Sequence, residues 1–271
     1  MVPALLLVLV AQAPAQAPAP DLAALAERTR PAVVKLVARD AFGNELGNGT
    51  GFFVSADGRI LTNHHVVRGA PDLVAILEGN REVRILGVLA DDEERDLAVL
   101  QAEDGRYPAL QLEDGRDPRV GEQVAVIGSP IGLAGTLSTG IVAAIRAEGA
   151  DLGPYGKAPS WQLQISAPIS PGSSGSPVLA EDGKVVGIAV GLISVGQALN
   201  FAIPAKPARA LLATIASDAR PRPLADAGRA ARKVGRNLAV SAAIFLLLGA
   251  GAWLALRPGR SSPGARHGTR D

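Results

Sequence analysis

Short apolar stretches separated by turn residues run through the middle of the chain. Between residues 31 and 204, stretches rich in valine, isoleucine and leucine recur at intervals of about 8–12 residues and are punctuated by glycine and proline. The clearest stretches lie at residues 32–37, 51–54, 73–77, 82–86, 123–127, 140–145 and 184–188. Asp-Gly pairs, which are typical of hairpin connections, lie at 57–58, 114–115 and 182–183. This pattern predicts an all-β body.

Helical patterns are confined to the two flanks of this body, at residues 21–30 and 204–216. An alternating βαβ architecture is therefore disfavoured. A polar stretch at 114–119, which contains Pro118, divides the body into halves of about 85 residues, each the size of a small barrel. We place a subdomain boundary there.

The N-terminal end has the pattern of a targeting segment. Residues 4–11 form a short apolar run, and an Ala/Pro/Gln tract with small residues suited to cleavage continues through Pro20. We expect a signal peptide over residues 1–15, then a Pro/Ala-rich linker and a short helix over residues 16–30. Because no Lys or Arg precedes the apolar run, a disordered start is the alternative.

The C-terminal end contains a candidate membrane span. The 19 residues 238–256 carry no charged side chain, and as a helix they would extend about 28 Å, which matches a bilayer core. We expect a transmembrane helix over 237–256, preceded by a basic juxtamembrane linker, 205–236, and followed by a basic tail, 257–271. A buried helix of a globular domain is the alternative.

The net charge of +1 conceals an uneven distribution. Up to Pro204 there are 15 basic and 23 acidic side chains, and after it there are 12 basic and 3 acidic ones. The basic excess fits residues that flank a membrane span, and we expect no nucleic-acid partner because the region lacks interleaved aromatics and any nucleic-acid module. Four basic residues lie on either side of the span, so only the signal peptide orients it. It places the body on the extracytoplasmic side, periplasmic or extracellular, and the tail in the cytoplasm.

The residue types restrict the chemistry. The chain has no cysteine, which excludes disulfides, zinc-thiolate sites and cysteine nucleophiles. With only His64, His65 and His267, a histidine-rich metal site is also disfavoured, and we predict neither a metal nor a cofactor. Any chemistry would use hydroxyls, carboxylates and these few imidazoles.

Three segments together suggest a serine hydrolase. An imidazole, His65, follows one apolar stretch, Asp96 directly precedes another, and Ser174 lies in a Gly/Ser loop. Each feature alone has an ordinary structural explanation. A serine nucleophile, however, needs a base to take its proton and a carboxylate to orient that base, and here the three types occur in the order His, Asp, Ser.

The orders of catalytic residues in other serine-hydrolase folds fit this sequence less well. An α/β-hydrolase has its histidine after the serine, and the only later one is His267, beyond the candidate span. A subtilisin-like order of Asp, His and Ser could use Asp40 or Asp57 as its aspartate, but the sequence lacks the helix-rich body that this fold requires.

Four ordered motifs resemble the trypsin-like serine proteases of the HtrA/Deg type. They are TNHHVV at 62–67, DLAVL at 96–100, PGSSGSP at 171–177 and NFAIP at 200–204. The resemblance covers about residues 31–204 and implies a chymotrypsin-like double β-barrel with a cleft between the barrels. His65 and Asp96 would come from the first barrel and Ser174 from the second. The family pattern Thr-Asn-x-His-Val selects His65 over His64, which occupies the variable position.

The resemblance also implies a role for each residue. Ser174 would attack a peptide carbonyl, His65 would transfer the proton, and Asp96 would hold the imidazole. The backbone N–H groups of Gly172 and Ser174 would form the oxyanion hole. We interpret the acidic cluster at 91–94 as a solvated turn, because Asp96 alone directly precedes the apolar stretch.

The implied substrate pocket has Pro168 at its base. Its wall would be the strand of Gly187, Ile188, Ala189 and Val190. Because no carboxylate occupies the base, we expect a small or aliphatic residue at the cleavage position, with the substrate paired beside the pocket as an extra strand.

The chain departs from the family pattern in two respects. Ser173 and Ser176 replace the asparagine and the second glycine of the commoner loop, but both are small, so we expect its geometry to survive. The 32 residues 205–236 are too few for a PDZ domain, so regulation through such a domain is not transferred and oligomerisation is left open. We expect a membrane-anchored serine endopeptidase that acts on exposed or unfolded polypeptides. The alternatives are a catalytically silent peptide-binding module and an esterase.

Overall fold

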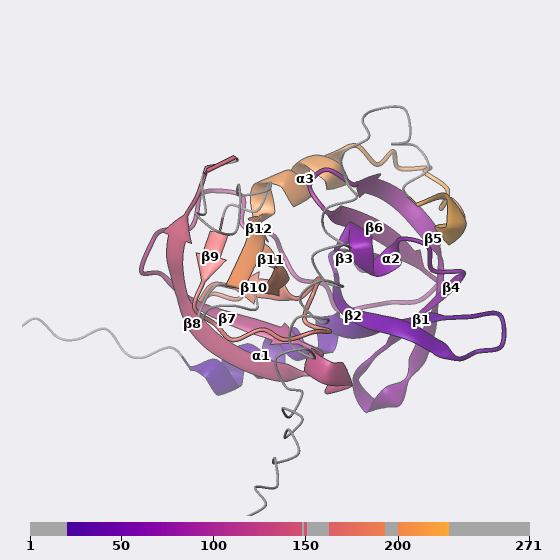
Figure 1. Cartoon of the computed structure of the whole chain (residues 1–271), viewed down its shortest axis with the longest axis horizontal. Helices are drawn as coiled ribbons and strands as arrows, with labels where there is room; N and C mark the ends of the chain where they lie inside the picture. The colour runs from indigo at the N-terminus through magenta and orange to yellow at the C-terminus, as the bar shows by residue number, and fades with distance from the viewer. Residues whose placement is uncertain (1–20, 148, 151–162, 193–199, 228–271) are drawn as a thin grey trace, which may run out of the picture. The chain divides into compact units, whose positions relative to one another are not determined.

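The computed structural model describes residues 21–147, 149–150, 163–192 and 200–227. Twelve antiparallel strands in this part form two closed six-stranded barrels (Figure 1). The all-β, double-barrel prediction is confirmed. The expected signal peptide, the transmembrane helix at 237–256 and the tail at 257–271 lie outside the described residues. Among the residues that are described, no helix has the length and apolar character needed to cross a membrane.

The first barrel is formed by the N-terminal strands, in the order β1-β2-β3-β6-β5-β4. Its strands are β1 (Val33–Arg39), β2 (Glu45–Phe53), β3 (Arg59–Thr62), β4 (Asp72–Ile76), β5 (Glu82–Asp92) and β6 (Leu97–Ala102). Short 3₁₀ turns lie at Arg30–Ala32 and Glu78–Asn80. A four-residue helix, α2 (His64–Val67), lies between β3 and β4.

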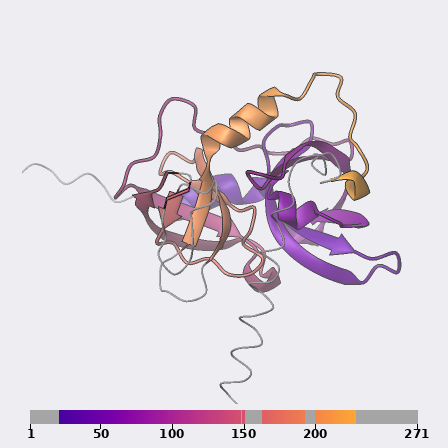
Figure 2. The same ribbon diagram turned by 45° about the horizontal axis from the view of Figure 1, so that its top comes forward.

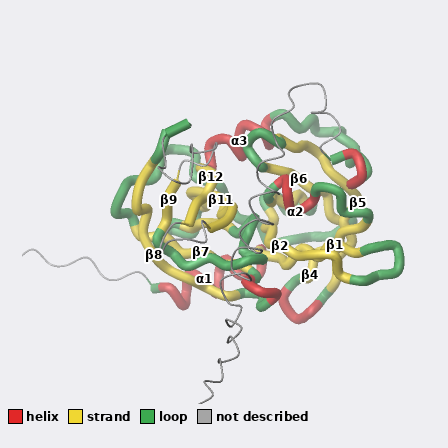
Figure 3. The backbone as a smooth tube through the Cα atoms, in the orientation of Figure 1, coloured by secondary structure: helices red, strands yellow, loops and turns green. Residues whose placement is uncertain are grey.

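The second barrel has the order β10-β11-β12-β9-β8-β7. Its strands are β7 (Gln123–Gly128), β8 (Thr136–Ile145), β9 (Leu163–Ile165), β10 (Pro177–Leu179), β11 (Val185–Leu192) and β12 (Asn200–Pro204). A 3₁₀ turn, Pro130–Gly132, follows β7. Figure 3 shows how little of the body is helical. The polar stretch at 114–119 lies in the connection between β6 and β7.

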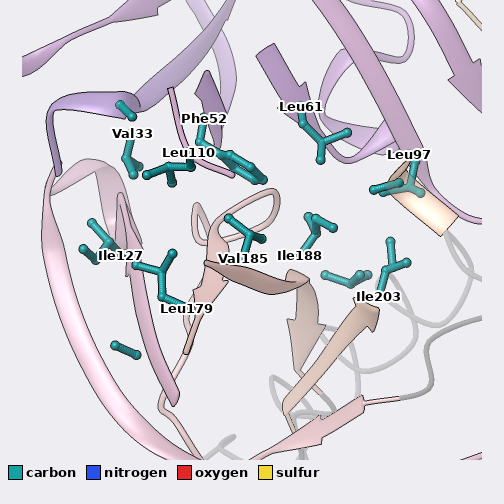
Figure 4. Close-up of a cluster of buried hydrophobic side chains, with 14 of the residues drawn as sticks. Val33, Phe52, Leu61, Leu97, Leu110, Ile127, Leu179, Val185, Ile188 and Ile203 are labelled. Carbon is teal, nitrogen blue, oxygen red and sulfur yellow. The ribbon is translucent and has the colours of Figure 1, made fainter. Parts of the chain in front are cut away.

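The strands read as continuous apolar runs because many of them are buried on both faces. Successive side chains on a strand point to opposite faces, so Phe53 and Ile60 pack inside the first barrel, whereas their neighbours Phe52 and Leu61 pack between the barrels. A third cluster fills the second barrel around Val142. Figure 4 shows the cluster between the barrels, in which side chains of the first barrel face those of the second.

Both predicted helical flanks are helices. At the N-terminal flank, α1 (Leu22–Thr29) begins after Asp21, whose side chain accepts a hydrogen bond of 2.9 Å from the N–H of Ala24. At the C-terminal flank, α3 (Ala205–Ala213) contacts β5 and β6 of the first barrel as well as β11 and β12 of the second (Figure 2). The two helices thus pack against the core that the barrels share.

The prediction that residues 205–236 form a linker is wrong for residues 205–227, because these residues belong to the folded body. Beyond α3, Arg222 and Val88 exchange two backbone hydrogen bonds of 2.8 and 2.9 Å, so the chain adds a bridge to β5. Gly87 permits this approach, because a Cβ there would lie 2.1 Å from the carbonyl oxygen of Arg222. The following 3₁₀ turn, Leu224–Asp226, then buries Leu224 in the core of the first barrel. These few contacts leave no periodic pattern in the sequence.

The connection between the barrels contains a buried carboxylate, Glu113. Its Oε1 atom accepts hydrogen bonds from the backbone N–H groups of Gly115 and Asp114, at 2.9 and 3.0 Å. Lys184 and Arg116 lie 3.9 and 3.8 Å from its carboxylate oxygens. The hydrogen bond from Gly115, followed by the charge of Lys184, holds the pKa of Glu113 below its ordinary value.

We expect the Glu113→Gln variant to be less stable than the wild type at about pH 7, with a difference that shrinks on acidification. A carboxylate whose pKa is lowered by folding stabilises the native state above its unfolded-state pKa of about 4.3, and this contribution is lost as the pH falls through the folded-state value. Urea unfolding of both proteins at several pH values measures the difference. A matched Glu27→Gln change on the exposed face of α1 serves as control, and a pH-independent difference for Glu113→Gln would contradict the prediction.

Candidate active site

Helix α2 presents His65 at the surface of the first barrel. The helix begins after Asn63, which has extended backbone angles, and it buries Val67 and His64. The His65 side chain is 43% exposed, whereas that of His64 is 3% exposed. Adjacent helix positions point in different directions, so only one imidazole of the pair is open to solvent.

Asp96 lies directly before β6 and contacts His65 through both carboxylate oxygens. Oδ1 accepts the backbone N–H of His65 at 2.8 Å, and Oδ2 lies 2.7 Å from its Nδ1. The Asn63 side chain donates to the Asp96 carbonyl at 3.0 Å, and Asp96 has a left-handed φ of +56°. Because a carboxylate only accepts, this arrangement places the proton of a neutral imidazole on Nδ1 and leaves Nε2 as an acceptor.

The acidic cluster before Asp96 is only partly a solvated turn. Asp91 lies within β5 with a side chain that is 9% exposed, and it forms an ion pair with Arg222. Its Oδ2 also lies 3.5 Å from Nδ1 of the buried His64. The solvated-turn interpretation is therefore wrong for Asp91, whose partner Arg222 comes from a distant part of the chain.

Ser174 lies in a loop built from two consecutive turns of the second barrel. The N–H of Ser173 bonds to the carbonyl of Ser170 at 2.9 Å, and that of Ser176 bonds to the carbonyl of Ser173 at 3.0 Å. Gly172 and Gly175 take left-handed φ values of +94° and +88°, which glycine adopts without steric cost. Within the described part of the chain, the N–H groups of Gly172 and Ser174 have no hydrogen-bond acceptor.

The Ser174 side chain is held by the second barrel. The Ser174 hydroxyl donates to the carbonyl of Val190 at 2.7 Å. The backbone carbonyl of Ser174 accepts the N–H of Thr50 at 2.8 Å. Among the described residues, no hydrogen bond joins Ser174 to His65. The structure thus brings His65 and Asp96 into direct contact and holds the Ser174 hydroxyl on β11.

Ser173 and Ser176, which replace the asparagine and the second glycine of the commoner family loop, have different surroundings. The hydroxyl of Ser173 accepts the N–H of Ser170 at 3.3 Å and so closes the first turn. The hydroxyl of Ser176 is buried and has no hydrogen-bond partner among the described groups. It fits because the facing position is Gly128, where a Cβ would lie 2.1 Å from this hydroxyl.

The residues expected to form the substrate pocket differ in exposure. Pro168 is exposed, and its carbonyl accepts the Ser138 hydroxyl at 2.7 Å. Gly187, Ile188, Ala189 and Val190 lie on β11, and all four are buried. The side chains of Ile188 and Val190 pack between the barrels, so β11 presents the Val190 carbonyl, rather than these side chains, to the Ser174 loop.

Sequence reasoning assigned no role to Thr50 and Asn63, and only Asn63 lies within a quoted motif. Asn63 belongs to TNHHVV, and Thr50 is flanked by Gly49 and Gly51 within β2. Two glycines inside a strand indicate a close approach of another segment, and this signal points to Thr50.

Comparison with known proteins gives consistent matches. The sequence profile of the family described as "Trypsin-like peptidase domain" matches residues 49–188. The human "Serine protease HTRA4" is 37% identical over 199 residues, which cover 71% of this chain and 41% of that protein. A "Probable periplasmic serine endoprotease DegP-like" from Hahella chejuensis is 41% identical over 140 residues, which cover 52% and 29%. The chain thus spans less than half the length of these curated relatives.

Solved structures show the same similarity. The serine endoprotease from Yersinia pestis superposes with a TM-score of 0.63 and 28% identity, covering 75% of this chain and 69% of that one. The HtrA-type protease AlgW with a tripeptide gives a TM-score of 0.63 and 31% identity, covering 72% and 63%.

Proposed function

Because the chain belongs to the trypsin-like peptidase family and is a serine protease of the HtrA/Deg type, we propose that it cleaves peptide bonds with Ser174, His65 and Asp96 as its catalytic triad. The observation that carries this proposal is the double contact between Asp96 and His65. It fixes both the ring orientation and the tautomer that a general base needs. These residues occupy the motif positions at which the family has its triad.

The proposed reaction proceeds through an acyl-enzyme. The Ser174 hydroxyl turns from the Val190 carbonyl towards Nε2 of His65, transfers its proton to that atom and attacks the carbonyl carbon of the substrate. The negative oxygen of the tetrahedral intermediate binds the N–H groups of Gly172 and Ser174. His65 then protonates the leaving amine, and the C–N bond breaks. Water, deprotonated by His65, hydrolyses the ester and restores the Ser174 hydroxyl.

The proposed substrate is an exposed or unfolded polypeptide that binds as an extended strand beside β11. Pairing with the Val190 carbonyl would displace the Ser174 hydroxyl and free it for the step above. A small or aliphatic residue would occupy the cleavage position next to Pro168. The uncharged residues 238–256 support a membrane anchor, and the periplasmic name of a relative supports an extracytoplasmic protease domain.

Labelling with a fluorophosphonate, followed by peptide mass spectrometry, tests the proposed nucleophile. We expect one adduct per chain, located on Ser174, because only a serine activated by a base reacts with such a probe. The Ser176→Ala variant is the matched control and should label like the wild type, since the Ser176 hydroxyl binds nothing in the loop. A folded preparation without an adduct would support the silent binding module instead.

Hydrolysis of matched substrates separates the protease from the esterase. A peptide amide and the corresponding ester are compared at equal enzyme concentration. Turnover of the ester alone would contradict the endopeptidase proposal, although the nucleophile would still label.

A further inference from the structure

Thr50 connects the first barrel to the loop that carries Ser174. It lies within β2 with a fully buried side chain, and all of its polar groups are bonded. Its hydroxyl donates to the carbonyl of Gly172 at 2.7 Å and accepts the N–H of Ser129 at 3.0 Å. Its backbone N–H donates to the carbonyl of Ser174 at 2.8 Å. One residue of the first barrel therefore makes three hydrogen bonds into the second.

These bonds fall on both sides of a proposed oxyanion donor. The Gly172 carbonyl belongs to the peptide group before Ser173, and the Ser174 carbonyl belongs to the peptide group after Ser174. The peptide group between them carries the Ser174 N–H. Thr50 thus restrains the two neighbours of the group that would have to point at the oxyanion.

The loop needs such a restraint because its backbone is built on glycine. Gly172 has no Cβ to limit its torsions, so rotation of its peptide groups meets little steric resistance. The hydroxyl of Thr50 supplies a directional bond to the Gly172 carbonyl, whose orientation is coupled to that of the Gly172 N–H through a single residue. This hydrogen bond is partly buried, and the lower local dielectric makes it stronger than a hydrogen bond in water.

Close packing brings Thr50 to this position. A Cβ at Gly175 would lie 2.0 Å from the Thr50 carbonyl oxygen, and a Cβ at Gly49 would lie 3.3 Å from the Ser174 carbonyl oxygen. Both glycines therefore permit backbone contact between β2 and the loop. The Thr50 carbonyl is fixed in turn by the hydroxyl of Thr62, which donates to it at 2.7 Å.

We propose that Thr50 is a positioning residue, which orients the oxyanion donors of Gly172 and Ser174 from the opposite barrel. This inference rests on the proposed function, because it assumes catalysis through Ser174. Loss of one oxyanion donor lowers kcat by about 10²–10³-fold, so loss of its positioning should lower kcat by about 10–100-fold. KM should change little, because the donors act on the tetrahedral oxygen and not on the bound substrate.

The test compares Thr50→Val, which removes the hydroxyl at similar volume, with Thr50→Ser, which retains it. We expect the valine variant to show the fall in kcat and to bind a peptide aldehyde more weakly, since the aldehyde forms a tetrahedral adduct that uses the same donors. The serine variant should recover most of the wild-type kcat and most of the affinity for the aldehyde. The control is Thr29→Val in α1, which also removes the hydroxyl of a buried threonine and its hydrogen bond, here to the carbonyl of Leu25, but no bond to the loop.

Equal kcat values for Thr50→Val and Thr29→Val would overturn the inference, as would a serine variant as slow as the valine one. Circular dichroism and thermal unfolding establish that each variant is folded. If Thr50→Val does not fold, Thr50→Cys replaces it, because cysteine has a weak thiol donor where serine has a hydroxyl. The kcat of Thr50→Cys should then be lower than that of Thr50→Ser. A wild type that neither labels nor cleaves would instead contradict the proposed function itself.

Discussion

The Ser174→Ala variant is expected to hydrolyse peptides about 10⁶-fold more slowly than the wild type in kcat. Removal of the hydroxyl eliminates the acyl-enzyme route and leaves only oxyanion stabilisation and substrate binding, which give a small residual rate. Substrate affinity should be retained, because the backbone groups of Gly172 and Val190 are unchanged. Steady-state kinetics with a fluorogenic peptide measures kcat, and fluorescence anisotropy measures binding.

The control for this experiment is the Ser176→Ala variant. Both serines lie in the same loop, but the hydroxyl of Ser174 bonds to Val190, whereas that of Ser176 is buried and has no hydrogen-bond partner among the residues that the structure describes. We expect Ser176→Ala to retain wild-type kcat and to be no less stable, since a buried hydroxyl without a partner costs free energy. Residual turnover in Ser174→Ala above about one per cent of the wild type would exclude Ser174 as the nucleophile.

The Asp96→Asn variant is expected to lose about 10⁴-fold in kcat while remaining folded. Asparagine tolerates the left-handed backbone that Asp96 adopts. If its amide oxygen keeps the bond to the backbone N–H of His65, its NH₂ group faces Nδ1. The ring proton would then move to Nε2, and His65 could no longer accept the proton of Ser174.

Asp92→Asn is the matched control, because it removes a charge from the same stretch of chain. The Asp92 carboxylate binds Arg95, through the backbone N–H and the guanidinium, both at 2.9 Å. We expect its kcat to stay within a few fold of the wild type, since surface ion pairs contribute little. An Asp96→Asn variant within tenfold of wild-type kcat would argue that Asp96 does not set the tautomer of His65.

Many strands were predictable because a strand that is buried on both faces consists of consecutive apolar residues, which are visible in the sequence. Adjacent apolar residues such as Phe52 and Phe53 pack into different cores, and such pairs produced the runs that predicted an all-β body. The three-residue strands Leu163–Ile165 and Pro177–Leu179 are too short for any periodicity. Their place in the second barrel is determined by their neighbours.

The segment after α3 was mistaken for a linker for a similar reason. Its attachment to the first barrel depends on one bridge between Arg222 and Val88, on the burial of Leu224 and on the ion pair with Asp91. Asp91 and Arg222 are 131 positions apart in the chain. No local pattern reports a contact at such a separation.

The sequence by itself determined the residue types, their order and the strand pattern. His65, Asp96 and Ser174 could be selected because their chemistry and motif positions are local properties of the chain. Only the tertiary structure decided that the Ser174 hydroxyl binds the Val190 carbonyl and that Thr50 holds the loop from the opposite barrel. The physical reason is that these hydrogen bonds join strands of separate barrels or distant loops, so their partners depend on how each barrel closes and how the two pack.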